Sequence, residues 1–483
     1  MKRSLKSLLF LFVILIFADA ARAEKTNCDF LGDHTNLGAI ECGRVFVPED
    51  HDDPKSKKIR IAYAVLKSKK VSSAGDPVIF FSGGPGGSSL QAGFLGFISK
   101  VSLRNERDII VFDQRGINHS GGLPDIGLDI FNAMAADLDM VEERSRFREI
   151  LRSFAATAEK AGIGLGNYNS IQSARDVGVL MDSLGYKKYN LFGISYGTRL
   201  ARLIQDMFPE KVNTSVLDSP NPMTDDFLID RMRSYSSAAE KIFRLCEKDK
   251  ECSEKYPRLR ETYFSTIKDL KKKPLAVSFN DEIFYLNSQD AMFFLRHRLY
   301  RNDALRSFPA FLAAIKNSEK EIIRQAILNE RLDSTDGNFN TSMFLAVSVF
   351  ESMDKSNTPE KIEDLYSGIP NFPEQLGFFT NLYIEGMNWH NKRLPREKRE
   401  FAVSSIPTMI FVNQYDPVTP PENGEVIRRR LTNSHLYVLD EGGHSGGDTE
   451  CKMRVMAGFM SDPDRKPDAS CLKIFDPDSG IGR

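Results

Sequence analysis

The 483-residue sequence has no excess of charge of either sign, because 65 Lys and Arg residues stand against 66 Asp and Glu residues. We therefore exclude a nucleic-acid role and attraction to an anionic membrane, since both need a positive field. After residue 23 the sequence also lacks any apolar run near the roughly 20 residues that a membrane span needs. It has no internal repeats or low-complexity linkers. With 41% hydrophobic and 27% charged residues, its composition is that of an ordinary folded protein.

Cysteine is scarce as well: the sequence has six, and neither a C-x-x-C pair nor a neighbouring histidine gives zinc-ligand spacing. We expect no metal and no other cofactor. The six residues instead fall into three pairs that are close in sequence. An oxidising compartment would let these pairs close, and local pairing is one hypothesis among the several connectivities that six cysteines allow. The pairs are Cys28 with Cys42, Cys246 with Cys252, and Cys451 with Cys471.

The first residues have the features of an export signal rather than of a folded element. A basic start is followed by an unbroken apolar stretch at residues 8–17 and by an A-x-A pattern at residues 21–23. We expect cleavage before Glu24. The mature protein is then periplasmic or secreted and has no membrane anchor.

The N-terminal half alternates short apolar runs with helical or turn segments, which is the pattern of an α/β fold with a mostly parallel sheet. A strand with one polar face is expected at residues 59–65. Continuous apolar runs predict strands buried on both faces. They lie at residues 78–81, 109–112, 189–192 and 214–217.

The character of the sequence changes between about residues 225 and 399, where long amphipathic stretches such as 303–328 predict a helical insertion. Strand-like runs return at residues 408–412 and 436–439, so both ends of the chain must complete one sheet. We therefore divide the chain into an export signal at 1–23, the first part of an α/β body at 24–225, a helical cap at 226–399 and the second part of the body at 400–483.

A G-x-S-x-G motif centred on Ser195 lies between a strand-like run and a helix-like run. Gly193 and Gly197 would let the strand and helix pass close together, so that the serine hydroxyl projects outward from a sharp turn. The start of the following helix adds partial positive charge and free N–H groups. We predict that Ser195 is a nucleophile.

A serine nucleophile needs a base that removes its proton, and histidine is the natural choice. Of seven histidines, only His444 follows an apolar run into a tight Gly-rich loop near the end of the chain. We predict that His444 is the base. His119 and His390 remain minor alternatives, and ordinary surface or structural roles suit the other four, which are His34, His51, His297 and His435.

The base must be held in one tautomer by a carboxylate. Asp416 leaves a buried strand into a loop stiffened by prolines, and it precedes His444 in the order expected for this kind of sheet. Asp218 competes with it, because a carboxylate one strand earlier could reach the same imidazole. We favour Asp416.

An oxyanion hole needs two backbone N–H groups aimed at one point. Tyr196, directly after the predicted nucleophile, should supply one. A Gly-rich loop at residues 82–88 should supply the other, with Gly84 as first choice and Gly83 as second. The loop matches neither G-x-x-x-x-G-K-[ST] nor G-x-G-x-x-G, so a nucleotide site is not expected.

Four segments together resemble the α/β-hydrolase superfamily and, within it, peptidase family S33, the branch of proline iminopeptidase and tripeptidyl aminopeptidase. They occur in the family's order at residues 82–88, 113–116, 193–198 and 416–420, followed by Gly443 and His444. The chain departs from many relatives at Ser82, where they carry histidine. The resemblance implies a sheet of about eight strands with the cap inserted after the sixth.

The resemblance also implies a serine hydrolase that removes residues from peptide N-termini, so the expected partner is a peptide with a free N-terminus. A carboxylesterase or small-molecule amidase on the same fold is the alternative. A binding protein on a hydrolase scaffold would need a broken triad, whereas all three residue types are present here.

Binding of a protonated amine calls for a carboxylate near the cleft between cap and body. The candidates in the cap are Glu385, Glu240 and Glu351. For Asp113 and Arg115 we favour a structural role, as a buried ion pair or hydrogen-bond network that braces the oxyanion loop.

Overall fold

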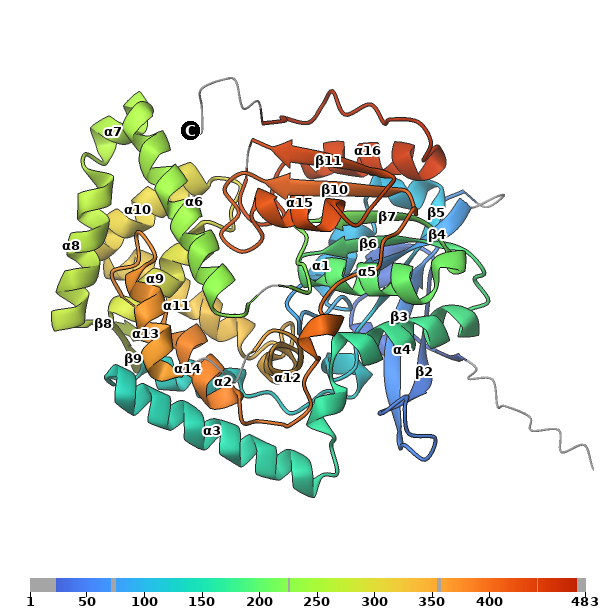
Figure 1. Cartoon of the computed structure of the whole chain (residues 1–483), viewed down its shortest axis with the longest axis horizontal. Coiled ribbons are helices and arrows are strands. Elements are labelled where there is room, and N and C mark those ends of the chain that lie inside the picture. Colours follow the sequence, from blue (N-terminus) through green and yellow to red (C-terminus); the bar gives the residue numbers. More distant parts are fainter. Residues whose placement is uncertain are drawn as a thin grey trace, which may run out of the picture.

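The computed structural model describes residues 23–70, 75–224, 226–353, 358–374, 376–440 and 442–475. Figure 1 shows an α/β body and, beside it along the longest axis, a helical layer. The predicted export signal lies outside the described residues except for Ala23.

In the described part of the chain, the body has one sheet of nine strands in the order β1-β2-β3-β5-β4-β6-β7-β10-β11. Its first three strands pair antiparallel at one edge, and the other six are parallel to one another. The predicted mostly parallel α/β sheet is thus confirmed. The strands are β1 (Glu24–Thr26), β2 (Ile40–Pro48), β3 (Lys58–Leu66), β4 (Gly75–Phe81), β5 (Arg107–Phe112), β6 (Tyr189–Ile194), β7 (Val212–Asp218), β10 (Thr408–Asn413) and β11 (Ser434–Leu439).

The ninth strand is the three-residue β1, which lengthens the edge of the sheet by pairing with β2. When β1 is set aside, eight strands remain and the helical insertion follows the sixth of them, β7. The insertion leaves the sheet at β7 and returns at β10, and these two strands pair side by side. The loops that follow β7 and β10 therefore lie next to each other at one edge of the sheet.

The central strands are almost fully buried because helices cover both faces of the sheet. One face packs against α1 and α16, and the other packs against α4, α5 and α15. The helices of the body segments are α1 (Ala92–Ile98), α2 (Gly127–Ala135), α3 (Met140–Lys160), α4 (Ser170–Ser183), α5 (Tyr196–Met207), α15 (Pro421–Arg428) and α16 (Thr449–Ser461).

The insertion between β7 and β10 is mainly helical, but it also contains a hairpin of β8 (Leu275–Phe279) and β9 (Glu282–Leu286) that we did not predict. The hairpin turns at Asn280 and Asp281, residue types that tolerate the positive φ angles found there. The cap helices are α6 (Ile229–Lys248), α7 (Lys250–Lys255), α8 (Leu259–Lys272), α9 (Ser288–Arg298), α10 (Ala304–Lys316), α11 (Lys320–Asp333), α12 (Thr341–Glu351), α13 (Pro359–Ser367) and α14 (Gly377–Gly386).

The amphipathic stretch at residues 303–328 forms two helices instead of one. α10 ends at Lys316 and α11 begins at Lys320. Ser318 between them has a φ of 57°, which a continuous right-handed helix does not allow. The same apolar spacing therefore continues across a turn.

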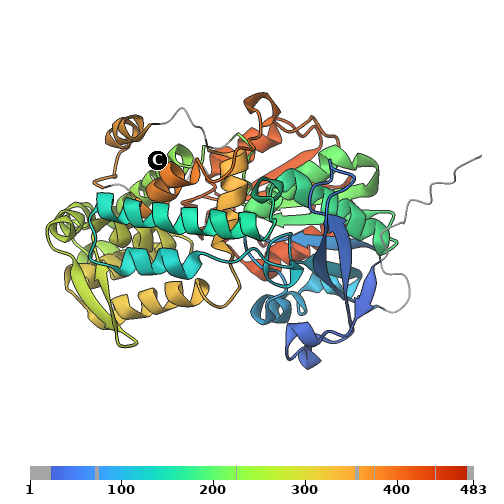
Figure 2. The ribbon, with the colours of Figure 1, turned by 90° about the horizontal axis from the view of Figure 1, so that it is seen from below.

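Helix α3 also belongs to the helical layer, although it precedes the insertion in sequence (Figure 2). Arg148 of α3 donates two hydrogen bonds of 2.8 Å to the Glu385 carboxylate of α14. Further along the same contact, Asn381 donates to the buried Glu143 carboxylate at 2.7 Å. The helical layer is therefore built from two separated stretches of the chain.

Glu143 and Asp290 of α9 are both 2% exposed. Burial raises the pKa of Glu143 to about 7, and burial together with the charge of Glu143 raises the pKa of Asp290 well above its ordinary value. In the unfolded chain these carboxyl groups have their ordinary, lower pKa values and lose their protons first as pH rises. The free energy of unfolding therefore falls with rising pH until the carboxyl groups of the folded protein ionise as well. We expect Glu143→Gln to be more stable than the parent above pH 7, by about 1–3 kcal/mol, and the gain to shrink near pH 4.

Urea unfolding at pH 5 and pH 8 measures this difference. Glu149→Gln is the matched control, because Glu149 lies on the same helix with 64% of its side chain exposed. A stabilisation that is equal at both pH values, or that the control reproduces, contradicts the prediction.

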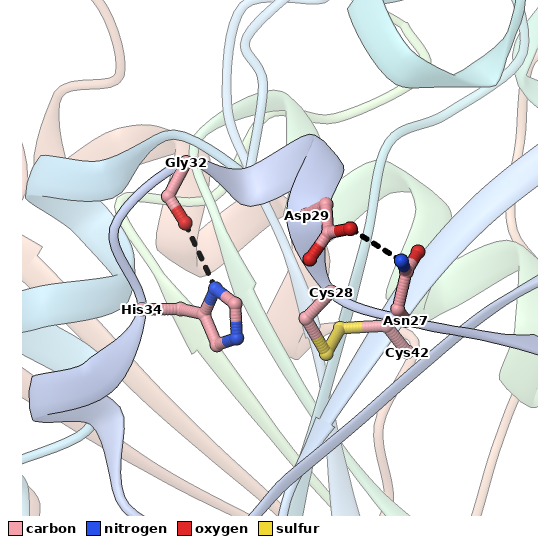
Figure 3. Close-up of a disulfide and its surroundings, with 6 residues drawn as sticks. All are labelled: Asn27, Cys28, Asp29, Gly32, His34 and Cys42. Carbon is pink, nitrogen blue, oxygen red and sulfur yellow. Dashed lines mark hydrogen bonds between the residues drawn. A yellow bond between two sulfur atoms is a disulfide. The ribbon is translucent and has the colours of Figure 1, made fainter.

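The three cysteine pairs that are close in sequence form disulfides in the structure, with Cα separations of 5.3, 5.0 and 5.9 Å. Figure 3 shows Cys28 joined to Cys42, beside the Asn27–Asp29 contact and the hydrogen bond from the His34 ring to the Gly32 carbonyl. Disulfides persist in oxidising compartments, so the three bonds indicate such an environment. Within the described ranges, no helix combines the length and apolar character of a membrane span.

Candidate active site

Ser195 stands at the sharp turn between β6 and α5, with φ 55° and ψ -124°. Its backbone N–H donates to the Asp218 carbonyl at 2.9 Å, which fixes the turn against β7. A Cβ added at Gly193 would lie 2.5 Å from the Gly197 carbonyl oxygen, and one added at Gly197 would lie 2.1 Å from the Phe81 carbonyl oxygen. Gly193 therefore lets β6 pass close to the start of α5, and Gly197 lets α5 pass close to the end of β4.

His444 and Asp416 are brought together from the loops after β11 and β10. The Nδ1–H of His444 donates to Asp416 Oδ2 at 2.8 Å. The other carboxylate oxygen accepts the backbone N–H groups of Val418 and Thr419 at 2.8 Å each, and the Thr419 hydroxyl donates to Oδ2 at 2.8 Å. This arrangement leaves His444 Nε2 free to accept a proton.

Asp416 is ionised in spite of its burial. Burial acts to raise its pKa, but the neighbouring His444 and the hydrogen bonds of the 416–419 turn outweigh it and lower the pKa below its ordinary value. A buried anion beside the imidazole stabilises the positive charge that a catalytic histidine acquires.

Ser195 and His444 line the same cavity, which has a volume of about 680 Å³. The ring of Tyr300, from the end of α9, packs edge-on against His444 with 5.2 Å between ring centroids. Among the described residues, no hydrogen bond joins the Ser195 hydroxyl to the imidazole. Such bonds are often long without substrate and tighten in the reacting complex.

Asp218, the competing acid, lies elsewhere. Its carboxylate accepts from the buried Lys452 ammonium at 2.6 Å, and the same ammonium donates to the Gly446 carbonyl at 2.7 Å. The pair thus links the turn that carries Ser195 to the loop that carries His444. The structure brings Asp416, and not Asp218, to the imidazole.

The Gly-rich loop after β4 lies against the predicted nucleophile. Gly83 and Gly84 line the cavity, and a Cβ added at Gly83 would lie 3.1 Å from the Ser195 Cβ. The Ser82 hydroxyl donates to the Gly87 carbonyl at 2.5 Å and so closes the loop where many relatives carry histidine. The Gly-rich loop therefore lies beside Ser195 at the wall of the cavity.

Asp113 and Arg115 serve two separate networks. Asp113 accepts from the Ser88 hydroxyl at 2.7 Å and from the Ser89 N–H at 3.0 Å, so it braces the end of the Gly-rich loop; burial raises its pKa. Arg115 instead pairs with the buried Asp176 at 2.6 Å. The expected bracing of the loop therefore involves Asp113 and not Arg115.

The three cap glutamates proposed from the sequence lie outside the catalytic cavity. Each is paired with arginine: Glu385 with Arg148, Glu240 with Arg260 and Arg244, and Glu351 with Arg199. Hydrogen bonds from Arg260, Asn371 and Arg244 lower the pKa of Glu240 to about 2. These carboxylates are neutralised by their partners and do not face the site.

Two other acids, Glu330 and Asp333 near the end of α11, line the cavity, and the sequence analysis missed both. His297, interpreted above as an ordinary histidine, also lines the cavity, with its Nδ1 3.4 Å from the Glu330 carboxylate. Their spacing of three residues places both acids on one face of α11. Among the described residues, no three His, Cys, Asp or Glu side chains converge as metal ligands.

The chain is similar to several known proteins. The chain is 31% identical over 224 residues to a tripeptidyl aminopeptidase of Streptomyces coelicolor, an alignment that covers 43% of this chain and 40% of that protein, so the match spans two fifths of the relative's length. It is 25% identical over 228 residues to the serine protease Hip1 of Mycobacterium tuberculosis, covering 44% of this chain and 43% of that protein. A putative hydrolase of Escherichia coli, YuaR, is 23% identical over 512 residues, with 97% of each chain covered.

Among solved structures, proline iminopeptidase of Mycobacterium smegmatis matches with 13% identity and a TM-score of 0.38, covering 87% of this chain and 98% of that one. The family model described as the alpha/beta hydrolase fold matches residues 76–450. Because this match covers most of the chain, the protein belongs to the α/β-hydrolase family, as the sequence motifs predicted.

Proposed function

We propose that this protein is an exported serine aminopeptidase that releases residues or short peptides from free peptide N-termini through an acyl-enzyme at Ser195. One observation carries the proposal: His444, which is hydrogen-bonded to Asp416, lines the same cavity as Ser195 and the Gly-rich loop. A carboxylate, an imidazole, a hydroxyl and backbone donors at one point are what acyl transfer requires.

In the proposed mechanism, Ser195 Oγ attacks the carbonyl carbon while His444 Nε2 takes the hydroxyl proton. The N–H groups of Tyr196 and Gly84 hold the oxyanion, and the helix start at Tyr196 adds partial positive charge. His444 then gives the proton to the leaving amine, which breaks the C–N bond. Water repeats the sequence on the acyl-enzyme and restores the serine.

Recognition of the substrate amine is assigned to Glu330 and Asp333 in this proposal. Glu330 is half-buried and Asp333 is exposed at the rim of the cavity, so a charged amine can reach both. The aminopeptidase and serine protease named above support a peptidase. The three disulfides and the predicted signal support export.

Chromogenic aminoacyl, dipeptidyl and tripeptidyl substrates test the proposal when each is compared with its N-acetylated form. We expect kcat/KM to fall by about 10- to 100-fold on acetylation, the worth of a charged hydrogen bond. The double variant Glu330→Gln/Asp333→Asn should have a smaller difference in kcat/KM between free and acetylated substrates. The control variant Glu321→Gln should keep the full difference, because the Glu321 side chain is 73% exposed on the same helix. Equal turnover of free and acetylated substrates would contradict an aminopeptidase.

The alternative of a carboxylesterase or small-molecule amidase is favoured by the aromatic wall of the cavity. Phe293, Phe294, Phe378 and Phe379 line it, and these rings suit a neutral acyl group. Simple esters in the same screen separate the two proposals, because an esterase does not need the amine.

A further inference from the structure

The catalytic cavity is also lined by arginines from the cap, Arg231 on α6 and Arg296 and Arg298 on α9. Arg296 is 1% exposed, so its guanidinium is held away from bulk water while it lines the cavity. Guanidinium groups stay protonated in proteins, so this residue brings a full positive charge into the site.

The contacts of Arg296 do not include a negative charge. Its Nη1 donates to the Tyr300 hydroxyl at 3.0 Å, and its guanidinium lies 5.3 Å from the Tyr300 ring centroid and 5.0 Å from that of Phe379. Its Nε has no hydrogen-bond partner. Among the described residues, no carboxylate forms a salt bridge with it.

Other arginines that are buried as deeply do have carboxylate partners. Arg115 pairs with Asp176, Arg199 with Glu351 and Arg202 with Asp206, with 0–3% exposure of the arginine side chains. Contact with aromatic rings offsets only part of the free energy needed to remove a charge from water. The burial of the Arg296 charge is therefore not offset by a carboxylate among the described residues, although the residue lines a cavity.

A second arginine side chain lies against the same aromatic ring at the cavity wall. Arg231 lies 5.9 Å from the centroid of the same Phe379 ring on which Arg296 packs. Planar, bidentate donors of this kind bind carboxylates in preference to neutral carbonyls.

We propose that Arg296 binds a carboxylate of the substrate inside the catalytic cavity. The position is close to the reaction centre, because Tyr300 contacts both the Arg296 guanidinium and the His444 ring. Glu330 and Asp333 of α11 line the same cavity, so the cavity has groups of opposite charge for the two ends of a short peptide. The carboxylate comes either from the C-terminus of a short peptide or from an acidic side chain, and the peptide form of this inference rests on the proposed function.

Calorimetric titration of Ser195→Ala, which removes turnover, tests the inference directly. The ligands are the tripeptide alanyl-alanyl-phenylalanine, its C-terminal amide, and the amide of alanyl-glutamyl-phenylalanine. We expect one carboxylate ligand to bind roughly 10- to 100-fold more tightly than the neutral amide, the worth of a charged hydrogen bond. A gain for the free acid identifies a C-terminal carboxylate, and a gain for the glutamyl peptide identifies a side chain.

Adding Arg296→Met should remove this gain and leave the Kd of the neutral amide unchanged, and Arg296→Lys should retain part of it. Arg324→Met is the matched control, since Arg324 lies on the surface of α11 with 45% of its side chain exposed. If the carboxylate ligands bind no better than the amide, or if their advantage survives Arg296→Met in a protein with unchanged Tm, the inference is wrong. If none of the three peptides binds, the inference is also wrong.

Turnover by the unsubstituted enzyme keeps this test separate from the proposed function. Tight binding of the free acid without release of amino acids would reject the aminopeptidase and retain the carboxylate site. Turnover without any preference for a carboxylate would reject the carboxylate site and retain the aminopeptidase.

Discussion

Replacing Ser195 with alanine should reduce kcat by about 10³- to 10⁶-fold, because Ser195 forms the acyl-enzyme in the proposed mechanism and no other serine, threonine or cysteine lines the cavity among the described residues. The residual rate would come from the oxyanion donors and from substrate positioning. The fold should be unaffected: Ser195 is 7% exposed, and alanine meets the φ of 55° with no more strain than serine does. The measurement is kcat on the best chromogenic substrate, with Tm as the check on folding.

A fluorophosphonate probe gives a second readout of the same residue, because it labels only activated serines. We expect labelling of the parent enzyme, none of Ser195→Ala, and full labelling of Ser253→Ala, a surface change on α7. A Ser195→Ala variant that still turns over substrate would show that the nucleophile is elsewhere. A parent enzyme that resists the probe would favour a binding protein on a hydrolase scaffold.

The parallel strands could be predicted from the sequence because their environment leaves a simple pattern. β4, β6, β7 and β10 are covered on both faces, so each contains a short and mostly apolar run. The hairpin of β8 and β9 is partly exposed and lies in a region of mostly helical sequence, which makes its two short strands hard to distinguish from the helices around them. The break at Ser318 depends on one backbone angle and leaves the apolar spacing intact.

The part of the candidate site that belongs to the α/β body could also be predicted from short segments of sequence, because each of its features lies at the end of a strand. Ser195 and Gly197 follow β6, which contains Gly193, and the Gly-rich loop follows β4. The choice between Asp218 and Asp416 was harder, because both stand at the ends of adjacent strands, β7 and β10. It depends on Lys452, a residue of α16 whose approach to Asp218 leaves no mark in the sequence near either acid.

The cap side of the site could not be predicted from residue type and spacing. Glu330 and Asp333 resemble many other acids on amphipathic helices, and only the packing of α11 aims them at the cavity. Arg296 is missed for a related reason: the sequence shows a basic helix end, but not that the guanidinium is buried without a carboxylate. The contacts that decide these roles join residues from different helices.

Asp416→Asn should lower kcat by about 10³- to 10⁴-fold while KM changes little. An asparagine amide can donate to His444 Nδ1, which favours the tautomer with its proton on Nε2 and so removes the base. The variant should also lose stability at neutral pH. The pKa of Asp416 is lowered in the folded state, so its contribution is present above the ordinary carboxyl pKa and is lost as pH falls through the folded value. Kinetics at pH 7 and unfolding at pH 7 and pH 3 measure both effects.

Asp218→Asn is the informative comparison, because the two acids were competitors on sequence grounds. This change leaves the Asp416–His444 pair intact but removes the counter-charge of Lys452, which is 4% exposed. We expect a loss of stability of about 3–5 kcal/mol and a much smaller fall in kcat per folded molecule. The reverse result, with full activity in Asp416→Asn and a collapse in Asp218→Asn at unchanged Tm, would exchange the two roles and require the His444 loop to rearrange during catalysis.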